Sequence, residues 1–390
     1  MPRLLHMADV HLGARHQDLG EVAAQQRERQ FAAFRRAIDL ALEEHVDAVL
    51  VAGDLFDSNQ QPRRSVERAA AEFQRLAAAG IRTVLIPGTH DVYDPSSIYR
   101  VHDLAALAGQ RSGSDMVTLL TPDRPDIVLP GLDLVVFGRV AATKRMALSP
   151  LADLSAGDDP RARWRVGMVH GSLRIEGKLE DDAVIFTEAE IASSGLDYLA
   201  LGHWHSFREG RSGKTTWAYA GAPEPVAVDQ DGAGQVALVD LAEAKGERVV
   251  TVTPRPVGRT RFLKLDIDAG EITTQAVLVD RLTALADPDL VLDARVTGVE
   301  PDQLEMQDDE VERQLAALFL KVRVRNVAVP ASIDGELPPP DTVAGAFIRD
   351  LDAQIDAAQA AGDIGRAGEL REALRLGRLL LDDPSRVTVS

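Results

Sequence analysis

Five short strings of aspartate, histidine and glycine constrain this chain more than any other feature, because each lies beside an apolar run typical of a β-strand. The strings are Asp9-Val10-His11, Gly53-Asp54, Gly88-Thr89-His90-Asp91, His170-Gly171 and Gly202-His203-Trp204-His205. Five of the nine histidines fall within them. Carboxylates and imidazoles that follow strand ends gather at one edge of an α/β fold, where they can bind metal ions. The pattern therefore predicts a metal site.

The first 120 residues alternate strands with amphipathic helices. Apolar runs at 4–10, 47–56 and 81–88 are separated by helical patterns at 26–45 and 63–80. A βαβαβ order implies a parallel sheet with crossover helices. Residues 121–255 are richer in strands, as in DIVLP, LDLVVFG, RVGMVH, LDYLALG, TTWAYAG and QVALVDL. We expect a four-layer α/β sandwich of two mixed sheets.

The character of the sequence changes twice after this region. We expect a catalytic domain at 1–255 and a small α+β capping domain at 256–335. The segment 336–390 follows, in which the Pro-rich stretch GELPPPD precedes two amphipathic helices around Gly362. These helices suit docking to a partner or packing against each other.

Composition narrows the class of protein. The absence of cysteine excludes disulfides and thiolate zinc sites. No uncharged run is long enough to span a bilayer and no leader pattern opens the chain, so we expect a cytoplasmic protein without a membrane partner. The net charge of −18 opposes binding to nucleic acid. Local cations could still line a binding rim, and the candidates are Arg15, His16, Arg139, Lys144 and Arg174.

The spacing of the polar residues suits two ions rather than one. In Asp9-Val10-His11 alternate side chains point the same way on an extended segment, so both reach one ion. The two oxygens of Asp54 can bridge ions about 3.5–4 Å apart. His203 and His205 can serve different ions. Asp57 and Asp91 are placed to orient a ligand or a turn.

Together these strings resemble the calcineurin-like metallophosphoesterases. Leu12-Gly13, the string GDLFD and Ala220-Gly221-Ala222-Pro223-Glu224 are similar to the SbcD and YhaO branch, the bacterial DNA-repair exonucleases. The resemblance implies that Asp9, His11, Asp54 and His205 hold one ion, and that Asp54, Thr89, His170 and His203 hold the other. It also implies His90 as general acid, Mn²⁺ as the metal, DNA as substrate, an SbcC-like ATPase partner and a homodimer through the early helices.

Thr89 departs from the pattern of that family, which usually has Asn there. A hydroxyl is shorter than an amide and a poorer ligand, so we expect a weaker second metal site.

Two other functions stay open. The same site serves a small-molecule phosphodiesterase or phosphatase, which the acidic charge favours and the extra domain disfavours. A weakly active scaffold subunit of an ATPase complex is the other alternative. Clustered buried carboxylates are costly to keep without a function, which argues against it.

Overall fold

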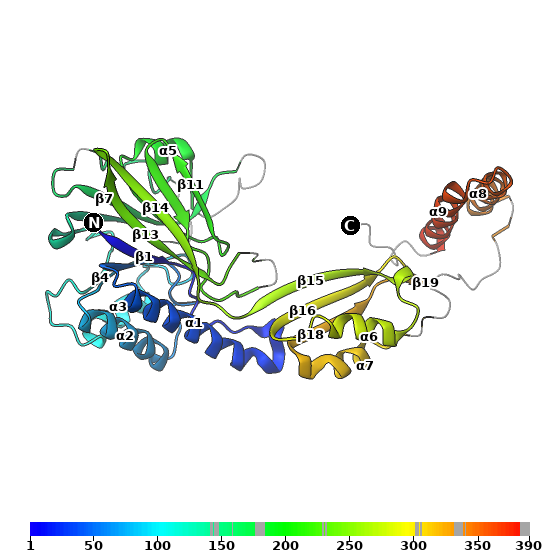
Figure 1. Ribbon diagram of the computed structural model, residues 1–390, viewed down its shortest axis with the longest axis horizontal. Coiled ribbons are helices and arrows are strands. Elements are labelled where there is room, and N and C mark those ends of the chain that lie inside the picture. Colours follow the sequence, from blue (N-terminus) through cyan, green and yellow to red (C-terminus); the bar gives the residue numbers. More distant parts are fainter. Residues whose placement is uncertain are drawn as a thin grey trace. The chain divides into compact units, whose positions relative to one another are not determined.

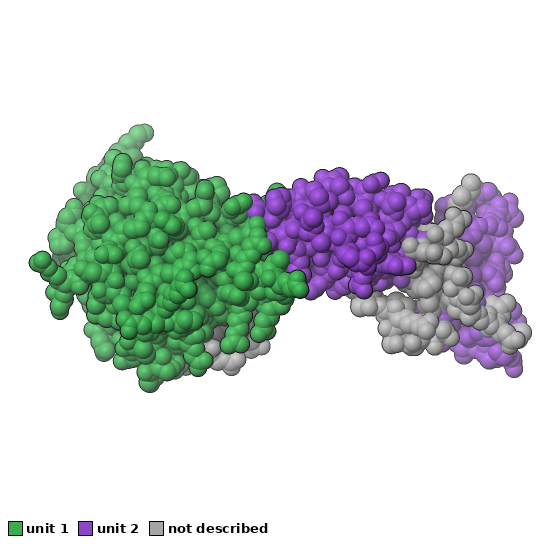
Figure 2. Space-filling view, turned by 90° about the horizontal axis from the view of Figure 1, so that it is seen from below, with its two compact units in different colours: residues 1–262 green, residues 263–390 purple. Residues whose placement is uncertain are grey.

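The computed structural model describes residues 1–140, 143, 148–157, 159–175, 184–227, 230, 232–300, 304, 306–330, 338, 339 and 341–382. The chain divides into two compact units, unit 1 at Met1–Phe262 and unit 2 at Leu263–Ser390, which Figure 2 colours separately.

Unit 1 contains two six-stranded mixed sheets. The first has the order β14-β13-β1-β2-β3-β4, in which β1 to β4 are parallel and β13 and β14 are antiparallel additions. Its strands are β1 (Arg3–Met7), β2 (Ala48–Ala52), β3 (Arg82–Ile86), β4 (Val117–Leu119), β13 (Gln235–Ala244) and β14 (Glu247–Pro256).

The second sheet has the order β11-β12-β10-β7-β6-β5, with antiparallel strands at its two edges and parallel strands between. Its strands are β5 (Asp126–Leu129), β6 (Leu134–Arg139), β7 (Trp164–His170), β10 (Tyr198–Gly202), β11 (Arg208–Ser212) and β12 (Thr215–Tyr219). Two short strands, β8 (Ser172–Leu173) and β9 (Ile185–Phe186), pair with each other and lie between β7 and β10 in the sequence.

Helices cover the outer face of each sheet, so unit 1 has four layers (Figure 1). One apolar core packs the helices against the first sheet, as Phe34 and Phe73 do. A second core fills the space between the sheets, and a third lies between the second sheet and α5. The helices of unit 1 are α1 (Ala23–Glu43), α2 (Arg63–Ala78), α3 (Ile98–Val101), α4 (Leu104–Leu107) and α5 (Glu188–Ser193).

This architecture confirms the predicted two-sheet α/β sandwich. The strand runs named from the sequence are strands here. Strands β4, β11 and β14, each at the edge of its sheet, were missed. The side chains of β14 are mostly exposed, so it carries no apolar run, and it forms only by pairing along β13.

Unit 2 contains a three-stranded sheet of order β15-β16-β18 over a separate apolar core. Its strands are β15 (Arg261–Asp268), which begins in unit 1, β16 (Asp287–Thr297), β18 (Phe319–Asn326) and the short pair β17 (Val299–Glu300) and β19 (Val329–Pro330). Its helices are α6 (Gln275–Thr283), α7 (Asp308–Leu315), and the two that flank Gly362, α8 (Val343–Ala360) and α9 (Ile364–Asp382). Most of the GELPPPD segment lies outside the described residues.

Within the described ranges, no helix is both long and apolar enough to cross a membrane.

Candidate metal centre

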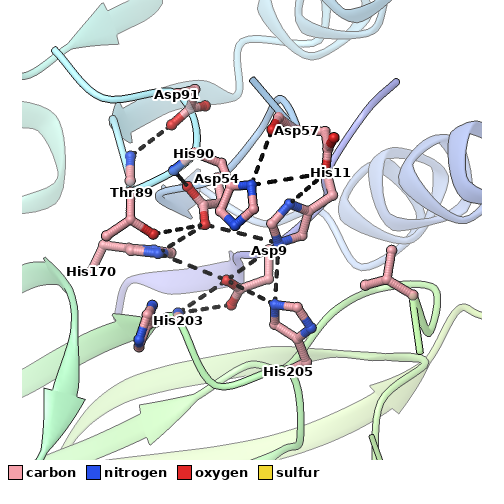
Figure 3. A network of polar contacts seen from close by, with 12 residues as sticks. Asp9, His11, Asp54, Asp57, Thr89, His90, Asp91, His170, His203 and His205 are labelled. Carbon is pink, nitrogen blue, oxygen red and sulfur yellow. Dashed lines mark hydrogen bonds and ion pairs between the residues drawn. The ribbon is translucent and has the colours of Figure 1, made fainter. Parts of the chain in front are cut away.

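The five strings follow the carboxyl ends of five central strands. Strands β1, β2 and β3 of the first sheet lead into Asp9, Asp54 and Thr89, while β7 and β10 of the second sheet lead to His170 and His203. The sheets lie face to face, so these loops meet at one end of the sandwich. Figure 3 shows the side chains converging from all five loops.

Backbone hydrogen bonds fasten the loops to one another. Asp9 N–H donates to the Gly53 carbonyl at 3.1 Å and His11 N–H to the Asp54 carbonyl at 3.0 Å, which joins the first two loops. Gly171 N–H donates to the Gly202 carbonyl at 3.1 Å, which joins the two loops of the second sheet. The ligand geometry is thus fixed by main chain as well as by side chains.

Several of the polar residues adopt left-handed backbone angles. The φ values are 53° at Asp9, 49° at His11, 52° at Asp54 and 103° at His203. Such angles cost non-glycine residues about 1–3 kcal/mol each and concentrate at functional sites. Gly53, at φ 92°, extends the same turn, and a Cβ there would collide with the His170 ring. The strain therefore lies in the segments that aim the candidate ligands.

One group of side chains surrounds His11. His11 Nε2 lies 3.1 Å from His205 Nε2, 4.0 Å from Asp9 Oδ1 and 3.9 Å from Asp54 Oδ2. Asp9, His11 and His205 have ligand atoms close enough to hold one ion. Asp9 and Asp54 are buried, whereas His205 is partly open to solvent. The structure brings together the four residues predicted for the first ion.

A second group surrounds His170. His170 Nε2 lies 3.0 Å from Asp54 Oδ2 and 4.0 Å from Asp9 Oδ1, and these three side chains form another candidate set. Thr89 Oγ1 lies 3.5 Å from Asp54 Oδ2, and the His203 ring is 5.3 Å from the His170 ring. The Asp54 carboxylate stands between the two groups, since its Oδ2 faces His11, His170 and Thr89 (Figure 3).

His90 stands at the open side of the cluster. Its side chain is 50% exposed, which leaves the ring accessible to a substrate. Nδ1 donates to the Asp57 carbonyl at 3.0 Å, because a carbonyl can only accept, so Nε2 is left for other partners. The Asp57 carboxylate lies 3.5 Å from His11 Nδ1 and so orients that ring. His11, Asp57 and His90 form a third candidate metal group, which the sequence analysis did not anticipate.

Asp91 links two of the loops. Its carboxylate accepts from Gly88 N–H at 2.7 Å and from Phe56 N–H at 3.1 Å, and the buried Tyr99 hydroxyl donates to it. Burial and the nearby Asp54 carboxylate raise the pKa of Asp91 to about 6. A further close contact tightens this junction, since His90 N–H donates to Asp54 Oδ1 at 2.8 Å. Asp91 thereby sets the position of the loop that carries Thr89 and His90.

The electrostatics of the cluster favour positive charge. Burial disfavours the imidazolium of His170, but the Asp54 carboxylate outweighs it and raises the pKa of His170. His11 behaves alike: Asp57, Asp54 and Asp9 outweigh burial and raise its pKa. In contrast, burial lowers the pKa of His205. Buried carboxylates need a compensating cation, which protons on imidazole or bound ions can supply.

The donor set fits divalent metal ions. Two imidazole nitrogens that face each other at 3.1 Å cannot both carry protons, and buried carboxylate oxygens lie within 4.0 Å of one of them. Mixed carboxylate and imidazole ligands suit hard to borderline divalent ions, and thiolates are absent from the chain.

The predicted DNA contacts do not share one environment. Arg15 and Arg174 are exposed, whereas Arg139 is half-buried at the end of β6, where burial lowers the pKa of its guanidinium. His16 is a correction: it lies in the interior with Nε2 3.4 Å from Gln30 Oε1, so it offers no surface to DNA. Lys144 lies outside the described residues.

Gln230 belongs to the site and was missed. Its side-chain amide contacts His205 Nδ1, while Gln230 Oε1 accepts from Val226 N–H at 2.8 Å. The contact holds the His205 ring with Nε2 toward His11. Nothing near Gln230 in the sequence resembles a motif, and only the fold brings it to His205, 25 residues away.

The chain belongs to the calcineurin-like phosphoesterase family, whose model matches residues 2–207. That stretch carries all five strings. The fold and the site thus define a metallophosphoesterase.

Curated relatives place the chain within a narrower group. It is 31% identical to the DNA double-strand break repair protein Mre11 of Aeropyrum pernix, over 70% of this chain and 64% of that protein. It is 31% identical to a subunit of the nuclease SbcCD of Rhodobacter capsulatus, over 67% and 71% of the two chains. It is 27% identical to the uncharacterized metallophosphoesterase YhaO of Bacillus subtilis, over 52% and 48%. The chain thus spans about half to two thirds of the first relatives that it matches.

Proposed function

We propose that this protein is a two-metal phosphodiesterase that cleaves DNA during repair. The observation that carries the proposal is the cluster in which Asp54 faces both His11 and His170, with His90 open to solvent beside it. The names of the relatives, a nuclease subunit and break-repair proteins, support DNA as the substrate.

Asp9, His11, Asp54 and His205 would hold one ion, and Asp54, Thr89, His170 and His203 the other. We propose Mn²⁺ for both, since it accepts carboxylate and imidazole together. Bound there, the pair of ions would supply a nucleophile at neutral pH and neutralise charge on the phosphoryl oxygens.

The chain's own residues then have separate tasks. The Nδ1–H of His90 donates to the Asp57 carbonyl, which leaves Nε2 toward the leaving group, and the doubly protonated imidazolium can donate its Nε2 proton to that group. Asp91 keeps the 88–91 loop against Asp54 through Gly88 and Phe56. Gln230 keeps His205 in place. The nucleophilic attack and the proton transfer thus use side chains from different loops.

The partners follow from the same relatives. The Rhodobacter protein is named as one subunit of a nuclease, so we extend the proposal to an SbcC-like ATPase partner, for which α8 and α9 are candidate docking helices. A homodimer through the early helices of the 1–255 domain, separate domains at 256–335 and 336–390, and a cytoplasmic location belong to the same proposal. Arg15, Arg139, Lys144 and Arg174 remain candidate DNA contacts.

The test compares wild type with His90→Ala. End-labelled duplex and single-stranded DNA are incubated with Mn²⁺, with bis(p-nitrophenyl) phosphate alongside. We expect the variant to lose about 10²–10⁴-fold in kcat on DNA, the usual contribution of a general acid. Mn²⁺ binding by calorimetry should stay unchanged, because His90 is not among the proposed ligands, and the loss of one bound ion would instead assign that ion to the group of His11, Asp57 and His90. His102→Ala, at the end of α3, is the matched control and should retain activity.

Two other outcomes of this test would contradict the proposed DNA nuclease. Hydrolysis of the small diester with DNA left intact would contradict the DNA substrate and favour a small-molecule phosphodiesterase, which the net charge of −18 suits. Inertness toward both substrates would favour a scaffold subunit.

A further inference from the structure

Trp204 lies between the two histidines of the last string and is held firmly. Its ring stacks on Tyr219 with centroids 4.5 Å apart and an interplanar angle of 13°. Its Nε1–H donates to Ser172 Oγ at 2.9 Å. The indole is therefore a fixed surface beside the candidate metal ligands. The proposed hydrolysis gives this side chain no role.

The loop that carries Trp204 is also fixed through its main chain. His203 N–H donates to both oxygens of Asp9 at 3.0 Å, and Ala222 N–H donates to the His205 carbonyl at 2.8 Å. Phe207 N–H donates to the Gly232 carbonyl at 3.1 Å. A side chain at the start of β11 therefore has a defined position relative to the metal ligands.

Arg208 is that side chain. Its guanidinium carbon lies 5.4 Å from the centroid of the Trp204 ring, within the range of a cation–π contact. The residue is exposed, and in the described part of the chain no carboxylate forms an ion pair with it. Some other arginines of unit 1 are paired with carboxylates, as Arg161 is with Asp159 and Arg248 with Asp197. Arg208 is thus an uncompensated cation in a strongly acidic chain.

An open pocket of about 380 Å³ adjoins this pair. It is lined by His203, Trp204, His205, Ser206 and Gln230, so Trp204 forms one wall and the candidate ligands another. A polyanion that reaches the ions through this pocket would pass Trp204. A guanidinium holds its N–H donors in one plane, which matches two oxygens of a phosphate, and contact with an aromatic ring restricts where that group can lie.

We propose that Arg208, positioned by Trp204, forms a phosphate subsite for the DNA strand next to the phosphodiester that is cleaved. The inference rests on the proposed function. Arg208 is a binding residue, and Trp204 acts through it as a positioning residue. In a chain of net charge −18, one unpaired guanidinium beside the pocket contributes a larger share of the attraction for phosphate than it would on a basic protein.

The test measures binding separately from cleavage. A fluorescent, phosphorothioate-protected single-stranded 20-mer is titrated with the full chain in Mn²⁺ at several salt concentrations, and its anisotropy is followed. We expect Arg208→Gln to raise Kd about fivefold to tenfold at low salt. The slope of log Kd against log salt should fall by about 0.7–1, the signature of one lost phosphate contact.

Three further variants separate charge, geometry and fold. Arg211→Gln removes the same charge from an exposed position on the same strand and should leave both Kd and slope unchanged. Arg208→Lys should restore the slope but only part of the affinity, because an ammonium lacks the planar fork. Trp204→Leu should weaken binding as Arg208→Gln does, and Trp204→Phe should recover most of it.

Equal Kd and slope in Arg208→Gln and Arg211→Gln would overturn the subsite while leaving the proposed function intact. Wild type that binds no DNA would overturn the proposed function and the subsite with it. Wild type that binds without cleaving still decides the question, because the measurement needs no turnover.

Discussion

Thr89 is the residue at which the candidate centre differs from the pattern that its motifs resemble. The hydroxyl stands 3.5 Å from Asp54 Oδ2 and is half-buried, so it lies in the second ligand group. A hydroxyl is a shorter and weaker donor to a metal than an amide carbonyl. Two other members of the group, Asp54 and His170, lie 3.0 Å apart. Any loss of affinity for the second ion should therefore originate at Thr89.

We expect Thr89→Asn to bind the second ion more tightly by about tenfold, or about 1.4 kcal/mol. The reason is that the longer amide can place its carbonyl oxygen within reach of the ion. Titration calorimetry with Mn²⁺ measures this directly, with Thr89→Ser as the control that keeps the hydroxyl. Identical Mn²⁺ affinities in wild type and Thr89→Asn would show that Thr89 does not limit the site.

At the scale of elements, a buried polar pair joins the two sheets of unit 1. His6 on β1 and Tyr198 on β10 are fully buried, and His6 Nδ1 lies 2.8 Å from the Tyr198 hydroxyl. Burial lowers the pKa of His6 to about 3, against about 6.5 for an exposed histidine. The folded chain therefore holds this imidazole neutral where the unfolded chain protonates it.

This difference makes stability depend on pH. Below about pH 6.5 the unfolded state binds the proton more readily, so the free energy of unfolding falls as pH drops toward 3, by up to about 1.4 kcal/mol per pH unit from His6. We expect His6→Asn to show a shallower loss between pH 6.5 and pH 5 than wild type in urea denaturation. Parallel pH profiles for the two proteins would contradict a neutral buried His6. Comparing the two cancels the other groups that titrate in this range.

For the whole molecule, ion binding should stabilise one unit selectively. The three candidate metal groups found among the described residues all lie in unit 1, Met1–Phe262. A ligand that binds only the folded state stabilises it by about 2.7 kcal/mol at 100 times its Kd. For a domain of this size each kcal/mol raises Tm by about 2–4 °C.

We therefore expect Mn²⁺ at 100 times its Kd to raise the calorimetric Tm of unit 1 by about 5–10 °C per bound ion. A chelator should reverse the shift. Asp54→Asn, which alters the carboxylate between both ligand groups, should remove most of it. A shift of equal size in Asp54→Asn would place the bound ion elsewhere in the chain.

Local sequence patterns were enough to predict the central strands and the Asp and His residues at their ends. Apolar runs such as AVLVA and YLALG are buried strands, and the Asp and His residues follow them directly, so their convergence at one sheet edge follows from local pattern and parallel topology. The edge strand β14 was not predicted, because it has no apolar run and is a strand only through its pairing with β13.

The contacts between loops distant in sequence could not be predicted in this way and come from the folded structure. It brought Gln230 to His205, the Tyr99 hydroxyl to Asp91 and Arg208 to Trp204, and it placed His16 in the interior. The physical reason is that periodicity and propensity act over a few residues. The contacts of a loop side chain instead depend on turn angles and on the distance between two packed sheets, neither of which a local pattern encodes.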